Sequence, residues 1–335
     1  MISKMHQLLD ILETNPDVYA LFRHCPYELL RKIRVRKFTD GEFELEQGEI
    51  YQYMYIIVDG RANVYSESEN GKKYFLCCSQ SGDLIGDMAL QPHIRCDREQ
   101  GGRYAILPGD PQRVDRVAEF LENVEFIAFN REHKTMRGTY KGIPVLVTST
   151  GMGGASTGIA VEELARIGVE CMIRIGSCGA LQPEMQMGDL VILNGAVRDE
   201  GTSKSYVDSI FPAVPDPDVL FALRGAAIKE GFAYHVGIGR SHDSFYVDNE
   251  RDVDHFWSKK GVLAGDMESA ALFTIGSLRG IKTGSILNTV ALYDGKLEDE
   301  INQYVSGENR VTQGEKNEII TALEAIASLE EQRKG

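Results

Sequence analysis

The stretch Cys171-Met-Ile-Arg-Ile-Gly-Ser-Cys-Gly-Ala180 decides the fold and carries the first functional signal. It begins as a short apolar run typical of a buried strand, and Gly176–Gly179 is predicted to be a turn of small residues. Arg174 interrupts the apolar run, and a buried arginine needs an anion or a carboxylate beside it. At the carboxyl end of a strand in an α/β sheet, Arg174 and the Ser177 hydroxyl would form an oxyanion pocket, most simply for phosphate. A structural arginine paired with a buried acid is the alternative.

The composition is that of an ordinary globular protein. A length of 335 residues favours two domains, and 43% hydrophobic residues are enough for a sizeable core. The net charge of -14 argues against nucleic acid or an anionic membrane as the main partner. No apolar run reaches the roughly 20 residues of a membrane span, and the N-terminus does not resemble a signal peptide. The six cysteines form no C-x-x-C pair, which indicates reduced thiols, a cytoplasmic protein and no zinc site.

Residues 1–90 form a separate N-terminal module. Helical spacing predicts helices over 5–22 and 27–33, and Asp-Gly, Gln-Gly and Asn-Gly turns then separate short runs with strand character. This pattern predicts a small antiparallel meander. Its strands are expected over 34–38, 42–45, 53–58, 62–65 and 73–77.

This module resembles the β-roll of cyclic-nucleotide-binding domains. The resemblance rests on Glu46-Gln-Gly-Glu49, Tyr55-Ile-Ile-Val-Asp-Gly-Arg-Ala62 and Ser81-Gly-Asp-Leu-Ile-Gly-Asp-Met-Ala89, and it covers most of residues 30–90. Gly86-Asp87 stands where the family has Gly-Glu, and the family's phosphate-binding arginine and closing helix have no matching segment. A remnant or interaction role without cyclic-nucleotide binding is therefore expected, and a cyclic-nucleotide sensor is the alternative.

From residue 91 onward, strands alternate with helices. Strands are predicted over 103–107, 143–148, the first residues of 171–180, 189–193 and 282–287; helices are predicted over 114–121, 156–167, 219–230 and 315–330. This alternation predicts an α/β domain over 91–335, with a mixed or largely parallel sheet and helices on both faces. The polar segment 194–217 is predicted to be a long functional loop.

Five motifs in this domain occur in an order that resembles one family. They are Pro108-Gly-Asp-Pro111, Ser149-Thr-Gly-Met-Gly-Gly154, Arg174-Ile-Gly-Ser177, Asp243-Ser-Phe-Tyr246 and Asp266-Met-Glu-Ser269. They resemble the nucleoside phosphorylases of the uridine phosphorylase type, over residues 91–330. The resemblance implies reversible cleavage of a nucleoside by phosphate to a free base and ribose 1-phosphate. It also implies a twisted mixed sheet flanked by helices, and a homo-oligomer, usually a hexamer built from dimers. Inorganic phosphate is the co-substrate, and no organic cofactor is implied.

The resemblance also assigns roles to residues around phosphate and ribose. Glu268 would accept hydrogen bonds from the ribose hydroxyls, with Asp266 beside it and Met267 packed under the sugar. His93 of a neighbouring subunit would reach the ribose 5′-hydroxyl. The implied phosphate ligands are Gly109, Arg113, Arg174, Ser177 and, from a neighbouring subunit, Arg131.

At the base end, the resemblance implies stacking of the base on Phe245 and a bond from Arg251 to a pyrimidine carbonyl. Arg251 would also stabilise the charge on the leaving base, so Arg174, Glu268 and Arg251 are the expected catalytic residues. Asn249 replaces the usual glutamine, and Thr289 replaces an arginine that often closes the base pocket. Leu292 stands near the position of the aspartate that purine-cleaving relatives use, which favours a pyrimidine.

Two alternatives on the same fold are a purine nucleoside phosphorylase and a nucleosidase. A nucleosidase uses water and needs no phosphate arginines, so Arg113, Arg131 and Arg174 argue against it. Asp266 stands where a glutamate is usual in the family. Glu132 and Ser156 match positions that hold a monovalent cation, such as K⁺, between subunits in some relatives.

Overall fold

A computed structural model of the chain describes residues 4–23, 33, 35, 38–39, 55–67, 73–80, 84–85, 90–293, 295 and 309–334. The chain forms two compact units, Met1–Ala89 and Leu90–Gly335. The expected strand over 42–45 and the Gly86-Asp87 motif lie outside the described residues, as does most of the expected helix over 27–33 and strand over 34–38.

The first unit begins with two helices, α1 (Lys4–Thr14) and α2 (Pro16–Phe22), where one helix over 5–22 was predicted. The break has a local cause, because the Asn15 side chain accepts a hydrogen bond from the Val18 amide (3.2 Å) and Pro16 favours the first turn of a new helix. Two antiparallel strand pairs follow, and they overlap three of the predicted strands. They are β1 (Tyr55–Ile56) with β4 (Leu84–Ile85), and β2 (Arg61–Glu67) with β3 (Lys73–Gln80).

The second unit is built on a nine-stranded sheet in the order β12-β11-β10-β13-β9-β5-β8-β7-β6. The strands are β5 (Tyr104–Pro108), β6 (Glu122–Asn130), β7 (His133–Tyr140), β8 (Ile143–Thr148), β9 (Cys171–Ala180), β10 (Leu190–Asp199), β11 (Tyr234–His242), β12 (Ala264–Asp266) and β13 (Lys282–Ala291). β9 runs parallel to both of its long neighbours, β5 and β13, whereas β6, β7 and β8 pair antiparallel. The predicted mixed α/β sheet is confirmed.

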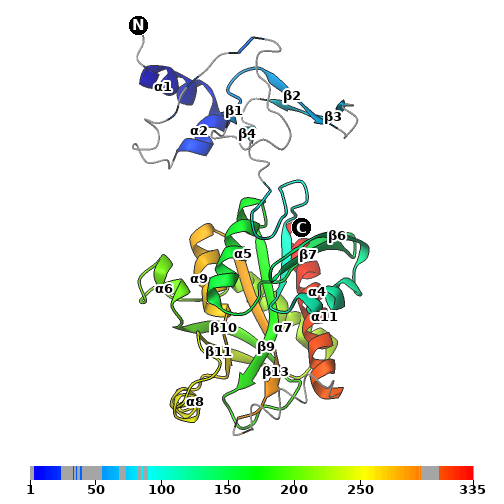
Figure 1. The fold of residues 1–335 in the computed structure, drawn as a ribbon, viewed down its shortest axis with the longest axis vertical. Coiled ribbons are helices and arrows are strands. Elements are labelled where there is room, and N and C mark those ends of the chain that lie inside the picture. Colours follow the sequence, from blue (N-terminus) through cyan, green and yellow to red (C-terminus); the bar gives the residue numbers. More distant parts are fainter. Residues whose placement is uncertain are drawn as a thin grey trace. The chain divides into compact units, whose positions relative to one another are not determined.

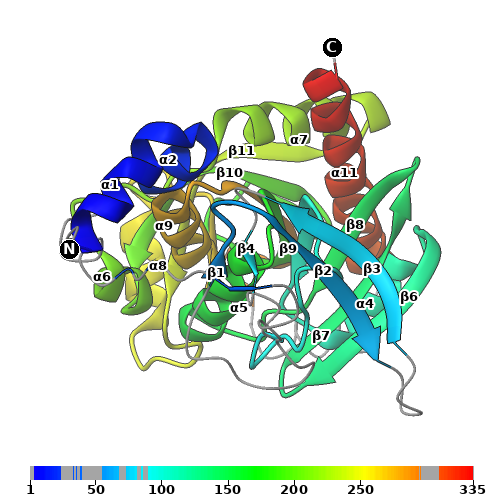
Figure 2. The same ribbon diagram turned by 90° about the horizontal axis from the view of Figure 1, so that it is seen from above.

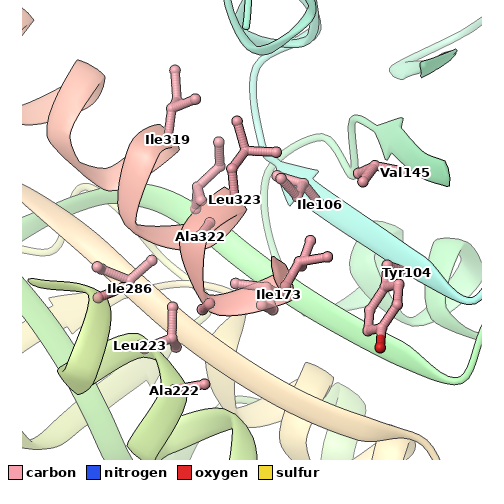
Figure 3. Close-up of a cluster of buried hydrophobic side chains, with 14 of the residues drawn as sticks. Tyr104, Ile106, Val145, Ile173, Ala222, Leu223, Ile286, Ile319, Ala322 and Leu323 are labelled. Carbon is pink, nitrogen blue, oxygen red and sulfur yellow. The ribbon is translucent and has the colours of Figure 1, made fainter. Parts of the chain in front are cut away.

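Helices cover both faces of this sheet (Figure 1). The helices are α4 (Pro111–Ala118), α5 (Gly154–Arg166), α6 (Thr202–Tyr206), α7 (Pro217–Glu230), α8 (Glu250–Ser258), α9 (Ser269–Arg279) and α11 (Asn309–Lys334). α4, α7 and α11 pack on one face, with α7 and α11 in contact (Figure 2), and α5 and α9 pack on the other. Figure 3 shows how Ile319 and Leu323 of α11 meet Ile106 and Ile173 of the central strands. Burial of such apolar side chains stabilises the domain by roughly 1.5–3 kcal/mol each.

Along β9, side chains alternate between these two faces. Ile173 and Ile175 belong to the core under α4 and α11, whereas Met172 and Cys178 belong to the core under α5 and α9. By this alternation Arg174 lies on the α5–α9 face and Ser177 on the opposite one.

The predicted turn over Gly176–Gly179 is wrong, because β9 continues to Ala180. β13 pairs with it in parallel through this segment, with Gly176 opposite Leu287 and Ser177 opposite Asn288. The glycine is needed for close approach instead, since a Cβ on Gly176 would lie 2.6 Å from Arg174 Nη2. Gly176 thus makes room for a neighbouring guanidinium.

The predicted loop over 194–217 is also partly strand and helix. β10 extends to Asp199 because β11 pairs with it as far as Asp199 opposite His242, and α6 follows. Within the described part of the chain, no helix is long and apolar enough to cross a membrane.

Candidate active site

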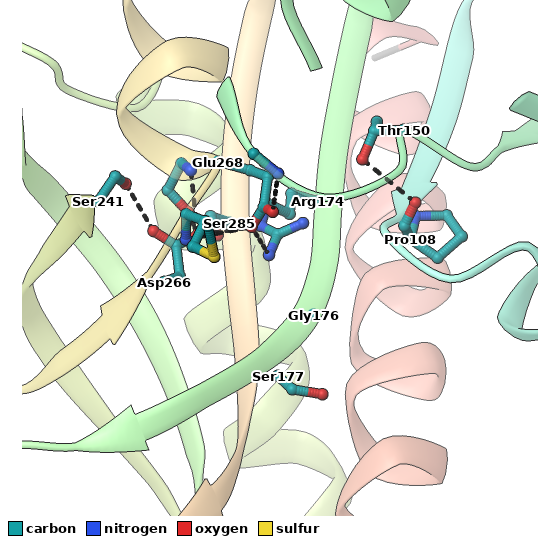
Figure 4. Close-up of polar contacts among 12 residues, drawn as sticks. Pro108, Thr150, Arg174, Gly176, Ser177, Ser241, Asp266, Glu268 and Ser285 are labelled. Carbon is teal, nitrogen blue, oxygen red and sulfur yellow. Dashed lines mark hydrogen bonds and ion pairs between the residues drawn. The ribbon is translucent and has the colours of Figure 1, made fainter. Parts of the chain in front are cut away.

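Arg174 stands at the centre of a buried ion-pair cluster (Figure 4). Its side chain is 5% exposed, and its Nε donates to Asp266 Oδ2 at 3.1 Å while its Nη2 donates to Glu268 Oε2 at 2.5 Å. Burial lowers the pKa of Arg174, but the negative charges of Glu268 and Asp266 raise it by more than burial lowers it, so the pKa lies above the ordinary value. The guanidinium is therefore held charged in a water-poor environment. The structure shows the pairing with buried acids that the sequence offered as the alternative interpretation of Arg174.

Asp266 ends β12 and accepts hydrogen bonds from several protein donors. Ser241 Oγ donates to its Oδ1 (2.5 Å), and the Ser269 amide (3.0 Å) and Ser269 Oγ (2.6 Å) donate to its Oδ2. With Arg174 Nε also on Oδ2, this carboxylate is fixed at the junction of β12 and α9. In this geometry Asp266 orients Arg174 and secures the first turn of α9.

Glu268 joins its own motif, 266–269, to the glycine-rich motif 149–154. Its Oε1 accepts from the Gly153 amide at 2.6 Å, and its Oε2 accepts from the Met267 amide at 3.2 Å as well as from Arg174. Gly153 has φ +90°, a conformation that L side chains rarely adopt. Burial raises the pKa of Glu268, while Arg174 opposes this shift. The structure thus brings the 149–154 and 266–269 motifs into direct contact.

A second buried cluster lies on the α4–α11 face. Arg113 Nη2 donates to Ser177 Oγ at 3.1 Å, and Arg113 Nε donates to Glu315 Oε2 at 3.0 Å. Arg113 Nη1 lies 3.2 Å from Glu318 Oε1. Arg116 of α4 also pairs with Glu315. Sequence reasoning predicted Arg113 and Ser177 but missed both glutamates, which lie in the polar first turns of α11, where acidic residues are ordinary.

The two clusters approach each other where β5 ends. Gly109 follows β5 directly, and a Cβ there would lie 4.0 Å from Arg174 Nη1 and 3.2 Å from the Gly151 carbonyl oxygen. Among the described residues, Arg174 Nη1 is buried and has no hydrogen-bond partner. Arg113 is also close enough to act electrostatically on Arg174. Gly109, Arg113, Arg174 and Ser177 are thus brought together, and such a set of donors suits a small oxyanion.

Among the described residues, Arg131 and His93 make no hydrogen bond or ion pair with this arrangement. Arg131 is exposed in the turn between β6 and β7 with φ +56°. His93 is 34% exposed, and its Nδ1 lies 2.6 Å from Oε1 of Glu163, a buried residue of α5. The Glu163 carboxylate also accepts from the His93 and Ile94 amides (3.0 and 2.9 Å to Oε2). Glu163 therefore fixes the turn that carries His93.

The predicted base-binding residues lie on the segment that leads into α8. Phe245 is partly buried and packs edge-to-face against Tyr246, with ring centroids 4.9 Å apart. Asn249 caps α8 and Arg251 is exposed in its first turn. Among the described residues, no hydrogen bond, ion pair or ring contact joins these three side chains to Arg174 or Glu268. Thr289 is buried, 3.9 Å from Cys178 Sγ.

Glu132 and Ser156 are neighbours, as the cation prediction requires. Ser156 Oγ donates to Glu132 Oε1 at 2.7 Å and also lies against the Thr150 carbonyl oxygen. This hydrogen bond is the main cause of the lowered pKa of Glu132. Carboxylate, hydroxyl and carbonyl oxygens are suitable ligands for a hard cation, so the residues fit a monovalent ion. In the described part of the chain, no group of three or more histidine, cysteine, aspartate or glutamate side chains could hold a metal ion.

Comparison with known proteins agrees with this geometry. Residues 103–326 match the model of the Phosphorylase superfamily, and the chain belongs to this family. Residues 35–97 match the model of the Cyclic nucleotide-binding domain, which confirms the N-terminal resemblance.

Individual relatives cover most of the second unit. A uridine phosphorylase of Thermococcus kodakarensis is 40% identical over 72% of this chain and 87% of the relative. A guanosine phosphorylase of Halorubrum lacusprofundi is 44% identical over 59% of this chain and 82% of the relative. The crystal structure of uridine phosphorylase from Vibrio fischeri is 44% identical, with a TM-score of 0.68, and covers 72% of this chain and 98% of the solved one.

Proposed function

We propose that this protein is a pentosyltransferase that cleaves a pyrimidine nucleoside with phosphate, converting uridine to uracil and ribose 1-phosphate. The observation that carries the proposal is the buried Arg174. Two of its nitrogens are held by Asp266 and Glu268, and the third, without a hydrogen-bond partner among the described residues, lies beside Gly109. Several relatives at about 40% identity are uridine phosphorylases, which supports the same reaction.

In the proposed reaction, phosphate is the nucleophile. Its oxygen forms a bond to the sugar C1′ as the bond from C1′ to the base nitrogen breaks, and the base leaves with the bonding electron pair and gains a proton. The sugar is cation-like in the transition state, so positioned anions stabilise it. Arg113, Arg174 and Ser177 would orient phosphate, and Glu268 would accept hydrogen bonds from ribose hydroxyls. Positioning alone lowers the barrier by about 7–11 kcal/mol in favourable cases.

At the base end, we propose that Phe245 stacks on the base and that Asn249 and Arg251 bind its polar edge. Asn249 and Arg251 are exposed and Phe245 is partly buried, so a bound base would cover these side chains. Met267, next to Glu268 on the same turn, would pack under the sugar. The Glu268 carboxylate accepts hydrogen bonds from the Gly153 and Met267 amides, and these two bonds fix the position of that turn.

We further propose a homo-oligomer, a hexamer built from dimers, in which each active site borrows residues from a neighbouring subunit. Arg131 is exposed in the hairpin turn between β6 and β7, which suits donation to a neighbour's phosphate. His93 has Nδ1 engaged by Glu163, so Nε2 would face the neighbour's ribose 5′-hydroxyl. A monovalent cation held by Glu132 and Ser156 would strengthen contacts between subunits.

No organic cofactor is needed for this chemistry. The buried free cysteines Cys96, Cys171 and Cys178 suit the reducing cytoplasm, where nucleoside salvage takes place.

The second candidate is phosphorolysis of a purine nucleoside. The guanosine phosphorylase relative, at 44% identity, favours it. Leu292 argues against it, because an aliphatic side chain offers no acceptor for a purine ring nitrogen.

A single assay separates these functions. We expect uridine to release uracil at least about a hundredfold faster with phosphate than in phosphate-free buffer, because the arginine cluster acts by positioning an anion. The measurement is base release from uridine, thymidine, guanosine and inosine, each with and without phosphate. Equal rates without phosphate would contradict phosphorolysis in favour of hydrolysis. Faster phosphate-dependent release from guanosine or inosine than from uridine would establish the purine alternative.

A further inference from the structure

Glu318 of α11 is a fully buried carboxylate at the edge of the proposed phosphate subsite. It is 0% exposed, and its Oε2 accepts a hydrogen bond from the Gly176 amide at 3.1 Å. The pairing of β9 with β5 ends one residue earlier, at Ile175 opposite Pro108. Glu318 therefore supplies an acceptor for a buried backbone donor just beyond the end of β5. This contact fixes the backbone from which the Ser177 side chain extends.

The other oxygen of Glu318 faces Arg113. Oε1 lies 3.2 Å from Arg113 Nη1, yet it makes no hydrogen bond to any described residue. Arg113 meanwhile donates to Ser177 Oγ and to Glu315. Glu318 thus contacts both groups that position Ser177. One of its oxygens binds the amide of the preceding residue, Gly176, and the other lies beside Arg113, which donates to the Ser177 hydroxyl.

Acidic groups outnumber basic groups among the described residues of the two clusters. Three guanidinium groups, those of Arg113, Arg116 and Arg174, pair with five carboxyl groups, those of Asp110, Asp266, Glu268, Glu315 and Glu318. If all are ionised, their charges sum to 3 − 5 = −2, and one arginine from a neighbour would leave −1. A phosphate dianion placed here would be repelled unless a carboxyl group becomes neutral.

Glu318 is the carboxyl group that loses least on protonation. Asp266 and Glu268 each accept several strong hydrogen bonds, and Glu315 is shared by two arginines. Glu318 accepts only one backbone hydrogen bond among the described residues. Hydrogen bonds to the ionised form favour that form, so the group with the fewest is the easiest to neutralise.

The electrostatic surroundings of Glu318 agree with this ranking. Burial raises the pKa of Glu318 to about 8, Arg113 from α4 opposes the shift, and Glu315 from the same helix adds to it. Arg174 from β9 also lowers it. Cys178 lies on the opposite face of β9 but is close enough to Glu318 for an electrostatic interaction, and it stays a neutral thiol because burial raises its pKa well above the ordinary value.

We propose that Glu318 is a positioning residue of the phosphate subsite and takes up one proton from solvent when phosphate binds. The inference rests on the proposed function, because it requires an anion at Arg113, Arg174 and Ser177. A neutral Glu318 keeps its bond to the Gly176 amide and releases the charge of Arg113 to the incoming anion. An ionised Glu318 competes with that anion for the same guanidinium.

Calorimetry on the full chain tests this coupling. Binding of phosphate is measured at about pH 8.5 in several buffers that differ in ionisation enthalpy. The dependence of the binding enthalpy on the buffer gives the number of protons taken up per anion. Sulfate, an anion that does not titrate in this pH range, is measured in the same way. We expect uptake of between about half and one proton by the wild-type protein and a loss of affinity of up to about tenfold per pH unit above pH 8. In Glu318→Gln, we expect uptake near zero and an affinity that no longer falls with pH.

Two further variants locate the proton. Glu315→Gln removes a negative charge beside Arg113 but leaves Glu318 in place. It therefore separates the effect of charge from that of proton uptake, and we expect the uptake to persist. Glu268→Gln tests the other buried acid whose pKa is raised. If Glu318→Gln binds phosphate with unchanged proton uptake, or if Glu268→Gln alone abolishes uptake, the inference is wrong. If the wild-type protein binds neither phosphate nor sulfate, the proposed function itself fails.

Thermal unfolding without any anion provides a second measurement. A carboxyl group whose pKa rises on folding contributes stability that is fully present below its unfolded value, about 4.5, and is lost as the pH rises through its folded value. We therefore expect Glu318→Gln to raise Tm relative to wild type at about pH 8.5 and to bring no such gain at about pH 4.5. An equal change in Tm at both pH values would contradict titration of Glu318.

Discussion

Replacing Arg174 by alanine should lower kcat/KM for phosphorolysis by about a hundredfold or more, the scale of roughly 3 kcal/mol for losing one preorganised donor to a developing charge. The side chain is buried, and its Nη1 lies beside Gly109 without a hydrogen-bond partner among the described residues, so the substitution removes a donor that is already in place for the anion. The loss should appear in the KM for phosphate as well as in kcat. Steady-state kinetics with varied phosphate measure both.

The same substitution leaves Asp266 and Glu268 buried without their cation, which itself destabilises by roughly 3–5 kcal/mol. Two controls separate this effect from catalysis. Millimolar guanidinium should restore part of the activity of Arg174→Ala. The second control, Arg198→Ala, removes another buried arginine, which donates to Ser203 Oγ (2.8 Å) and to loop carbonyl groups. This substitution should lower Tm without changing the KM for phosphate. An Arg174→Ala enzyme with near-normal turnover would remove Arg174 from the site.

Mixing two inactive variants should restore activity if sites are shared between subunits. Arg131→Ala lacks the donated arginine and Glu268→Ala lacks the ribose acceptor, so each alone should lose at least about a hundredfold in rate. In randomly mixed oligomers, about one quarter of the sites combine an intact Glu268 with an intact Arg131 from the neighbour. Activity after co-refolding, with mixed composition verified by mass, is the measurement.

The matched control pairs Arg174→Ala with Glu268→Ala. These two residues contact each other within one chain, at 2.5 Å, so every site in such a mixture lacks one of them. No recovery is expected there. Recovery in this control, or its absence in the Arg131 mixture, would contradict donation of Arg131 by a neighbouring subunit.

The sequence predicted those parts of the site that depend on residue chemistry. Arg174 inside an apolar run, and two acids around Met267, are costly arrangements that a fold keeps only for a purpose, and the structure brings them together. The mixed sheet and most of its strands were also predictable, because buried strands are long apolar runs.

The rest depended on contacts that no local pattern reveals. Gly176 resembled a turn residue, but its role is to make room for Arg174. Glu315 and Glu318 lie on a helix whose spacing predicts burial and says nothing of a partner 202 residues away. β6 and α8 were missed; β6 is largely exposed and α8 has no buried residue, so neither is part of the apolar core from which the other elements were predicted.

The long separation between Arg113 and its glutamates has a consequence for synthesis. Translation delivers Arg113 and Gly176 long before α11, which carries Glu315 and Glu318. A nascent chain that has left the ribosome only as far as α9 can form the central strands, but Arg113 and the Gly176 amide still lack their partners there. Closing so long a loop is slow, and domains settle as units once their last element arrives. The pocket for phosphate is therefore among the last features to mature, and a chain whose translation stalls before α11 is a substrate for chaperones rather than an enzyme.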